Sequence, residues 1–169
     1  MTAQRRPAAF LDRDGVLNED RGYVHDPNEL VWIPGAAKAL ERLRNAGFFV
    51  FVVTNQAGIG RGLYGEEDVH ALHAHMQDAL GGMIDAFRYC PHHPEAAVER
   101  YRIECRCRKP APGMIESLLD AYPVRREQSF LVGDRDTDLE AAAAAGVKGH
   151  RFVEGSLDVF VERILRGAG

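Results

Sequence analysis

Short apolar runs alternate along this chain with stretches in which apolar residues recur every three or four positions. The short runs predict buried strands at residues 8–11, 48–53, 84–89, 129–132 and 147–153. The periodic stretches predict helices at residues 36–46, 69–80, 112–122, 139–145 and 157–165. This repeated strand-then-helix order is typical of a parallel sheet with helices on both faces. The pattern therefore predicts a three-layer α/β/α fold, with residues 54–62 as a glycine-rich loop.

Polar residues follow three of these strands at the point where each strand ends. They are Asp12 with Asp14, Thr54 with Asn55, and Asp134 with Asp138. Open parallel sheets bind ligands outside the carboxyl ends of their strands, so we expect these side chains to share a pocket. Two aspartates separated by one residue can face the same side, and a third carboxylate would complete an oxygen site suited to Mg²⁺. Each cluster could instead be a turn or a helix cap, which is the simpler interpretation for Asp138 alone.

A magnesium site built from carboxylates suggests phosphoryl transfer. Carboxylates by themselves repel a phosphate dianion, so such a site also needs a positively charged side chain. The candidate is Lys109, which follows Arg108 and stands just before the predicted helix at 112–122. A single lysine is usually a solvated surface charge, and only the position of this one, between two polar strand ends, favours a role in the site.

Three cysteines and a histidine lie between the third predicted strand and the next helix. Cys90 and His92 are separated by one residue, and so are Cys105 and Cys107. Three thiolates and one imidazole form a closed tetrahedral ligand set for structural Zn²⁺. His93 is an alternative fourth ligand that spacing does not exclude, and three free buried thiols are the alternative to a metal site.

Composition and charge limit the other possibilities. The length of 169 residues predicts one domain over residues 1–169, and 46 % hydrophobic with 27 % charged residues is typical of a globular chain. The net charge of −4 gives no general attraction to nucleic acid or to an anionic membrane. No apolar run approaches the roughly 20 residues of a membrane span. We expect a cytoplasmic protein, and we expect His70, His73 and His75 to form a solvated helix face.

The polar motifs resemble the four signature motifs of the haloacid dehalogenase (HAD) superfamily of phosphatases. Residues 10–18 (FLDRDGVLN) correspond to the first motif, residues 54–56 (TNQ) to the second, Lys109 to the third and residues 133–138 (GDRDTD) to the fourth. The order and the residue types match throughout. The resemblance implies a Rossmann-like fold and hydrolysis of a phosphomonoester through an aspartyl-phosphate intermediate.

The resemblance also implies roles for the aspartates. Asp12 would be the nucleophile, and Asp14 would act first as general acid and then as general base. Mg²⁺ would be held by the Asp12 side chain, the Asp14 backbone carbonyl and Asp134. Asp138 would lie behind these ligands and hydrogen-bond to them.

The cysteine segment narrows the resemblance to a branch of the superfamily that dephosphorylates a heptose bisphosphate. The superfamily resemblance implies that Thr54 would hydrogen-bond the transferring phosphoryl group and that Lys109 would offset its charge. The substrate contacts implied for this chain are Asp20, Arg21, Gly22, Tyr23, Thr54, Asn55, Gln56, Arg108, Lys109 and Arg135. The predicted sheet and helices use nearly the whole length, so we expect no separate cap domain. We expect a monomer whose short loops select a small sugar phosphate.

Two other functions fit parts of the sequence. Histidinol-phosphate phosphatases share the zinc segment and the catalytic motifs, although residues 22–25 and 58–62 favour a heptose substrate. A zinc-knuckle module could bind nucleic acid through Arg106, Arg108 and Lys109. The negative net charge counts against that module, which also leaves the strand-end carboxylates unexplained.

Overall fold

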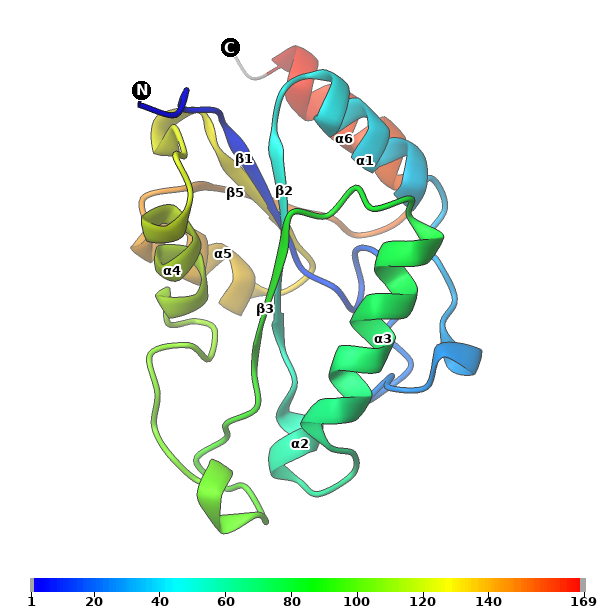
Figure 1. Cartoon of the computed structure of the whole chain (residues 1–169), viewed down its shortest axis with the longest axis vertical. Helices are drawn as coiled ribbons and strands as arrows, with labels where there is room; N and C mark the ends of the chain where they lie inside the picture. The colour runs from blue at the N-terminus through cyan, green and yellow to red at the C-terminus, as the bar shows by residue number, and fades with distance from the viewer. Residues whose placement is uncertain (1, 168–169) are drawn as a thin grey trace.

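Five parallel strands form the centre of the computed structural model, which describes residues 2–167 (Figure 1). They are β1 (Ala8–Leu11), β2 (Phe49–Asn55), β3 (Ala86–Cys90), β4 (Phe130–Gly133) and β5 (Lys148–Arg151). Their order across the sheet is β3-β2-β1-β4-β5. The chain builds outward from β1 to one edge and then returns to build toward the other. This order places a topological switch point beside β1, where open sheets of this kind bind ligands.

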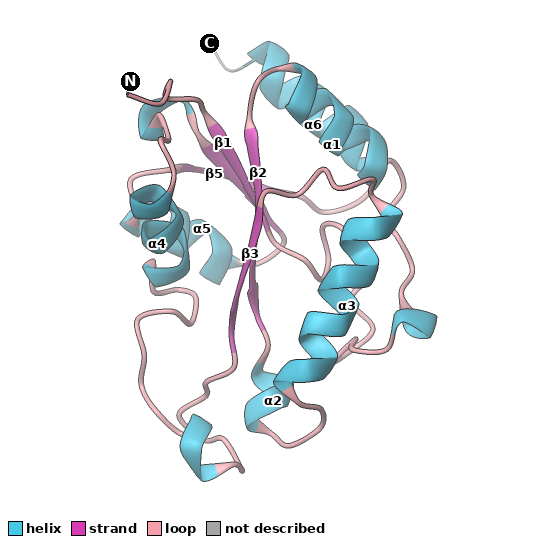
Figure 2. Cartoon of the chain, in the orientation of Figure 1, coloured by secondary structure: helices cyan, strands magenta, loops and turns pink. Residues whose placement is uncertain are grey.

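Helices cover both faces of the sheet. They are α1 (Ala36–Asn45), α2 (Ala57–Gly60), α3 (Glu66–Ala79), α4 (Gly113–Ala121), α5 (Asp136–Ala144) and α6 (Leu157–Gly167). Helices α1, α3 and α6 lie on one face, and α4 and α5 lie on the other (Figure 2). Side chains alternate between the two cores, so Leu11 packs with the first group and Phe10 with the second. The predicted three-layer fold is confirmed, and residues 2–167 contain no separate cap domain.

The predicted elements agree with the structure to within a few residues, with one correction after β2. The strand continues through Thr54 and Asn55, which pair with β3. The expected glycine-rich loop contains helix α2, because Ile59 is buried there in a small apolar cluster with Tyr64 and Val69. A helix of four residues is too short to leave a periodic pattern in the sequence.

The expectation that the three histidines of α3 form a solvated face is wrong for His73. His70 and His75 are exposed, but only 6 % of His73 is exposed. Met76 follows His73 by three residues and is also buried, so the two side chains share the inner face of the helix. The ring of His73 stacks on Phe87 of β3, with 4.4 Å between the ring centroids. The histidine takes the place of an apolar residue in the core, which hydropathy alone does not predict.

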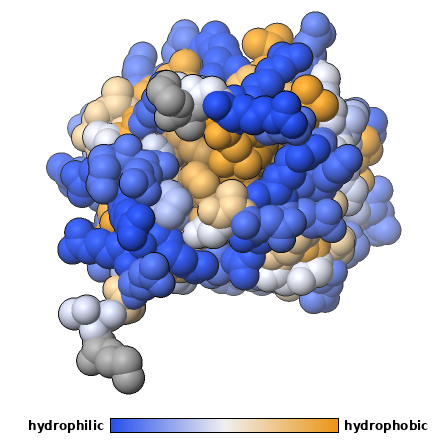
Figure 3. Space-filling view, turned by 90° about the horizontal axis from the view of Figure 1, so that it is seen from above, coloured by the Kyte–Doolittle hydropathy of each residue, from blue (hydrophilic) through white to orange (hydrophobic). Residues whose placement is uncertain are grey.

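The end of the molecule where the strands begin is polar at its margin and apolar at its middle. Figure 3 views this end and shows apolar side chains surrounded by hydrophilic ones. Among residues 2–167, no helix combines the length and the apolar character needed to cross a membrane. The polar strand ends lie at the opposite edge of the sheet (Figure 1).

Candidate active site

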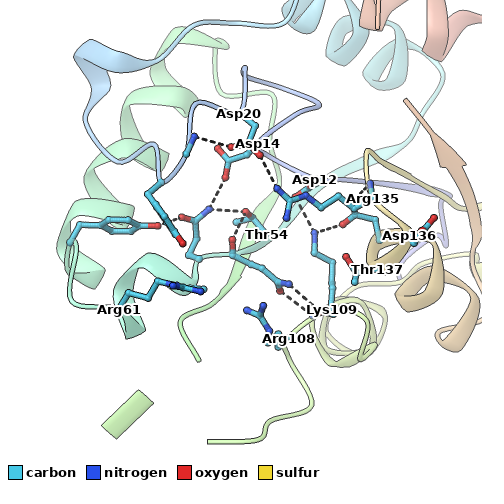
Figure 4. Close-up of a pocket in the computed structure, with 17 residues that line it drawn as sticks. Asp12, Asp14, Asp20, Thr54, Arg61, Arg108, Lys109, Arg135, Asp136 and Thr137 are labelled. Atoms are coloured by element: carbon cyan, nitrogen blue, oxygen red, sulfur yellow. Dashed lines mark hydrogen bonds and ion pairs between the residues drawn. The ribbon is translucent and has the colours of Figure 1, made fainter. Parts of the chain in front are cut away.

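The polar strand ends converge on one pocket of about 650 Å³ (Figure 4). Asp12 and Asp14 come from the loop after β1, and Thr54 comes from the end of β2. Asp138 lies in the first turn of α5, which follows β4, and Lys109 lies in the loop before α4. Three adjacent strands and two loops thus bring together residues that are more than 120 positions apart in the chain.

Lys109 is buried between two carboxylates. Its Nζ lies 3.0 Å from Asp12 Oδ1 and 2.6 Å from Asp138 Oδ1, and it donates to the Val53 carbonyl oxygen at 2.9 Å. Burial by itself would lower the pKa of Lys109, but the carboxylates of Asp12 and Asp138 outweigh burial and raise that pKa. The lysine therefore stays charged and holds a fixed position beside Asp12.

Asp138 caps a helix and lines the pocket at the same time. Its Oδ1 faces Lys109, while its Oδ2 accepts hydrogen bonds from the backbone N–H groups of Asp134 and Arg135 at 3.1 and 3.0 Å. These backbone groups precede α5 and would otherwise lack partners. Because both oxygens of Asp138 are already bonded to protein groups, this side chain is placed to orient its neighbours.

A buried oxygen without a partner indicates where a metal ion would bind. Carboxylate oxygens of Asp12, Asp134 and Asp138 lie within 4.8 Å of one another, and Asp134 Oδ1 has no hydrogen-bond partner among the described residues. Gly15 (φ +88°) allows this crowding, because a Cβ atom there would overlap the Asp134 carboxylate. Burial raises the pKa of Asp12 and of Asp134, and the Asp138 charge adds to both shifts. This crowded oxygen set fits Mg²⁺.

Gln56 connects the end of β2 to Asp14. Its Nε2 donates to Thr54 Oγ1 at 2.8 Å and to Asp14 Oδ2 at 3.1 Å. Its Oε1 accepts a hydrogen bond from the Tyr64 hydroxyl at 2.6 Å. Gln56, which the sequence predicts as a substrate contact, lines the pocket, and its amide atoms are bonded to protein groups. The side chain is therefore placed to orient Thr54 and Asp14.

Asn55 connects β2 to the loop that carries Lys109. Its Oδ1 accepts from the Lys109 backbone N–H at 3.0 Å, and its Nδ2 donates to the Lys109 carbonyl oxygen at 3.2 Å. Both bonds run to one residue, so they fix the backbone from which the buried lysine side chain extends. Asn55 and Arg108 also line the pocket.

The side chains of Cys90, His92, Cys105 and Cys107 converge in the long loop between β3 and α4. Their ligand atoms lie within 4.8 Å of one another, the sulfur atoms are 3.0 to 3.5 Å apart, and His92 Nδ1 lies 3.3 Å from Cys107 Sγ. These separations exceed a disulfide bond and suit ligands gathered around one ion. His93 instead accepts a backbone hydrogen bond outside the cluster, at 3.0 Å. The set of three thiols and one imidazole fits structural Zn²⁺.

The loop after β1 supplies part of the pocket rim. Asp20 Oδ2 pairs with Arg135 Nη2 at 2.9 Å, and both residues line the pocket together with Gly22 and Tyr23. Arg21, which sequence analysis predicts as a substrate contact, does not line the pocket. Its exposed guanidinium pairs with the neighbouring Glu19 at 3.1 Å.

Five further residues line the pocket that the sequence does not predict as site residues. They are Ala57, Arg61, Tyr64, Asp136 and Thr137. Arg61 follows α2, and its guanidinium lies 5.8 Å from the centre of the Tyr23 ring. The only signal for it in the sequence is a basic residue between two glycines shortly after a polar strand end.

The fold and the site define a HAD-like hydrolase. The profile of the HAD-hydrolase-like family matches residues 106–155. The chain is 50 % identical over 167 residues to the D-glycero-β-D-manno-heptose-1,7-bisphosphate 7-phosphatase of Rhodopseudomonas palustris, covering 97 % of this chain and 93 % of the relative. The protein of the same name from Escherichia coli K12 is 43 % identical over 148 residues, covering 86 % and 78 %.

A solved structure agrees with these sequence relatives. The crystal structure of D,D-heptose 1,7-bisphosphate phosphatase from B. bronchiseptica, complexed with magnesium and phosphate, has a TM-score of 0.78 to this chain. The two sequences are 31 % identical, and the match covers 97 % of this chain and 99 % of that one. The chain therefore belongs to the family of D-glycero-β-D-manno-heptose-1,7-bisphosphate 7-phosphatases. The resemblance seen in the motifs is confirmed.

Proposed function

We propose that this protein is a Mg²⁺-dependent phosphatase that removes the 7-phosphate of D-glycero-β-D-manno-heptose 1,7-bisphosphate. The observation that carries this proposal is the buried Asp12, which faces the Lys109 ammonium and stands beside the unpaired oxygen of Asp134. Relatives named for this activity match 86 to 97 % of the chain. The same names support the β anomer as the preferred form.

Asp12 is the nucleophile in this proposal. Its carboxylate oxygen attacks phosphorus, the bond from phosphorus to the sugar oxygen breaks, and Asp14 gives its proton to that oxygen. Water then attacks phosphorus and gives a proton to Asp14, so that inorganic phosphate leaves and the Asp12 carboxylate is restored. Lys109 and Thr54 stabilise the charge on the transferring group. An Asp12→Asn variant should therefore lose turnover while keeping its fold.

The two metal sites have separate roles. Asp12, Asp134 and the backbone carbonyl of Asp14 would hold Mg²⁺, with Asp138 behind them. When bound, Mg²⁺ offsets the negative charge of the phosphate beside these carboxylates. The cysteine and histidine cluster would hold Zn²⁺ as a structural ion, because four protein ligands leave no position for a reactive water. This ion would stiffen the loop that ends in Arg108 and Lys109.

Several arginines around the pocket suit a substrate that carries a second phosphate. Arg61, Arg108 and Arg135 all line it, in addition to the buried Lys109. Arg135 is already paired with Asp20, whereas no carboxylate lies within ion-pair distance of Arg61 or Arg108 among the described residues. These two arginines are the candidates for the phosphate that is not removed. The two unpaired arginines therefore support a substrate with a second phosphate.

A panel of phosphomonoesters tests the proposal. The purified protein with Mg²⁺ should hydrolyse the β form of heptose 1,7-bisphosphate with a higher kcat/KM than the α form, heptose 7-phosphate or histidinol phosphate. Inorganic phosphate release measures each rate. Faster turnover of histidinol phosphate would overturn the proposed substrate and favour the alternative enzyme that sequence analysis leaves open.

For the other alternative, a zinc-loop module that binds nucleic acid, two of the three cations that it would use are already paired with carboxylates. Arg106 pairs with Glu116 at 2.7 Å, and Lys109 is buried against Asp12. We further propose that the enzyme acts as a monomer in the cytoplasm, where a reducing environment keeps the three thiols available to zinc. Light scattering on the eluting protein would test the monomer.

A further inference from the structure

Arg13 stands between the two motif aspartates and is fully buried, although the proposed reaction assigns it no role. Its Nε and Nη2 donate to Asp14 Oδ1 at 3.2 and 3.1 Å, and Nη2 also lies 3.1 Å from Asp14 Oδ2. The same Nη2 donates to the Val24 carbonyl oxygen at 2.8 Å. A planar guanidinium bonded to both oxygens fixes the direction of a carboxylate as well as its position.

His73 of α3 lies within hydrogen-bond distance of the remaining nitrogen of this guanidinium. Its Nε2 lies 3.3 Å from Arg13 Nη1. Burial, with help from the charge of Arg13, lowers the pKa of His73 to about 3, so the ring is neutral at pH 7 and can accept this hydrogen bond. Stacking on Phe87 keeps the ring in place. A residue 60 positions away in sequence therefore sets the orientation of Arg13.

Two further side chains restrain Asp14. Asn18 donates to its Oδ1 at 2.9 Å, and Gln56 donates to its Oδ2 at 3.1 Å. The Asp14 side chain nevertheless remains 21 % exposed, at the pocket. The carboxylate is thus anchored from behind while its open side faces the place where a leaving oxygen would bind.

We propose that Arg13 and His73 are positioning residues, which together hold the Asp14 carboxylate in the direction required for proton transfer to the leaving group. This inference rests on the acid and base role of Asp14 in the proposed function. General acid catalysis requires the donor within hydrogen-bond reach of the leaving oxygen, and a carboxylate free to rotate would spend little time there. Neither residue lines the pocket.

Substitutions at His73 test this role without removing a charge from the core. His73→Leu and His73→Met remove the acceptor for Arg13, whereas His73→Gln keeps an amide oxygen at a similar distance from the backbone. Each variant is assayed for kcat/KM on heptose bisphosphate and on 4-nitrophenyl phosphate, whose leaving group departs without a proton. The ratio of the two values does not depend on how much of the preparation is folded. His75→Leu, on the exposed face of the same helix, is the matched control.

We expect kcat/KM for the sugar phosphate to fall by about tenfold in His73→Leu and His73→Met, against less than about threefold for the aryl phosphate. His73→Gln should lie close to wild type, and Asp14→Asn should show the same selectivity with a larger loss. Equal losses on both substrates, or equal behaviour of the Leu and Gln variants, would assign His73 to packing alone and overturn the proposal. If heptose bisphosphate is not a substrate, the proposed function fails, and the comparison is made with the best alkyl phosphate of the panel.

Discussion

Three carboxylates and one ammonium group meet within a buried space at the ends of β1 and β4. Lys109 neutralises only one of the charges of Asp12, Asp134 and Asp138, and the pKa of Asp12 and of Asp134 is raised by burial. An ionised carboxylate in such surroundings is unfavourable unless a cation joins it. The excess of negative charge at these three aspartates therefore favours a bound divalent cation, as does the fact that the ligand atoms are carboxylate oxygens.

The substitution Asp134→Asn tests this balance. It removes one buried charge and one candidate ligand oxygen, so the variant should need at least about tenfold more Mg²⁺ for half-maximal activity. In the absence of Mg²⁺ it should melt no lower than wild type, because a costly buried charge has gone. Thermal melts with and without Mg²⁺ measure this directly, since a ligand of the folded state raises the melting temperature. An unchanged Mg²⁺-induced shift in the variant would exclude Asp134 as a ligand.

At the level of elements, one carboxylate joins helix α3 to the long loop between β3 and α4. This loop contains the cysteine and histidine cluster and is called the zinc loop below. Glu66, in the first turn of α3, accepts hydrogen bonds from the hydroxyls of Tyr89 and Tyr101 at 2.6 and 2.8 Å. These bonds lower the pKa of Glu66. The two hydrogen bonds to Glu66 therefore connect β3 and the zinc loop to α3, which also contains His73.

We expect Glu66→Gln to lower the free energy of unfolding by about 1 kcal/mol at neutral pH. Because the folded pKa of Glu66 lies below its ordinary value of 4.5, the unfolded chain takes up the proton first as the pH falls. The stability that Glu66 contributes is therefore present above the ordinary carboxyl range and is lost below it. Denaturant unfolding at several pH values should show the difference between wild type and variant shrinking toward acid pH. The exposed neighbour substitution Glu67→Gln is the control, and it should show no such trend.

The zinc loop is the second element whose stability can be tested alone. Cys105→Ser should reduce zinc content and lower the melting temperature by roughly 10 °C, because a structural zinc ion contributes directly to folding. Activity should fall with it, since the Arg108 backbone N–H donates to Cys105 Sγ at 3.3 Å and Lys109 follows directly. Metal analysis by mass spectrometry provides the check. A variant that keeps its full zinc content would show that the ligand set is wrong.

The whole molecule selects its substrate without a cap domain in residues 2–167. The pocket wall comes from loops after β1, after α2, before α4 and at the start of α5. Each of these loops carries one of the charged rim residues, which are Asp20, Arg61, Arg108 and Arg135. Substrate specificity therefore depends on how the elements that carry these loops pack together. A substitution in one loop should alter substrate binding without altering the phosphoryl-transfer step.

Arg61→Met provides the corresponding test. If Arg61 binds the phosphate that is not removed, its loss should raise KM for heptose 1,7-bisphosphate by about tenfold, equivalent to one charge-assisted hydrogen bond. The kcat/KM for heptose 7-phosphate should stay within a factor of about two. Arg163→Met, on the exposed side of α6, serves as the control. Equal losses on the bisphosphate and the monophosphate would place Arg61 outside the recognition of the second phosphate.

Local pattern accounts for most of the elements and for the groups of residues that meet at the site. The strands around Phe10 and Val52 are continuous apolar runs because both of their faces are buried, and their ends are marked by Asp12 and Thr54. The spacing of the cysteines likewise indicates a zinc site, but the choice of His92 over His93 as the fourth ligand comes from the structure. Features of this kind can be predicted from neighbouring residues without knowledge of the fold.

The α/β class, the order of the motifs and the chemical types at both metal sites can be predicted from the sequence alone, because each is marked by short segments of neighbouring residues. The burial of His73, the hydrogen bonds from Arg13 to Asp14, and the presence of Arg61 but not Arg21 at the pocket follow from tertiary packing. These outcomes depend on how α3 packs on β3 and where the loops after β1 and α2 turn. Such arrangements are set by the packing of whole elements, and no periodicity along the chain encodes them.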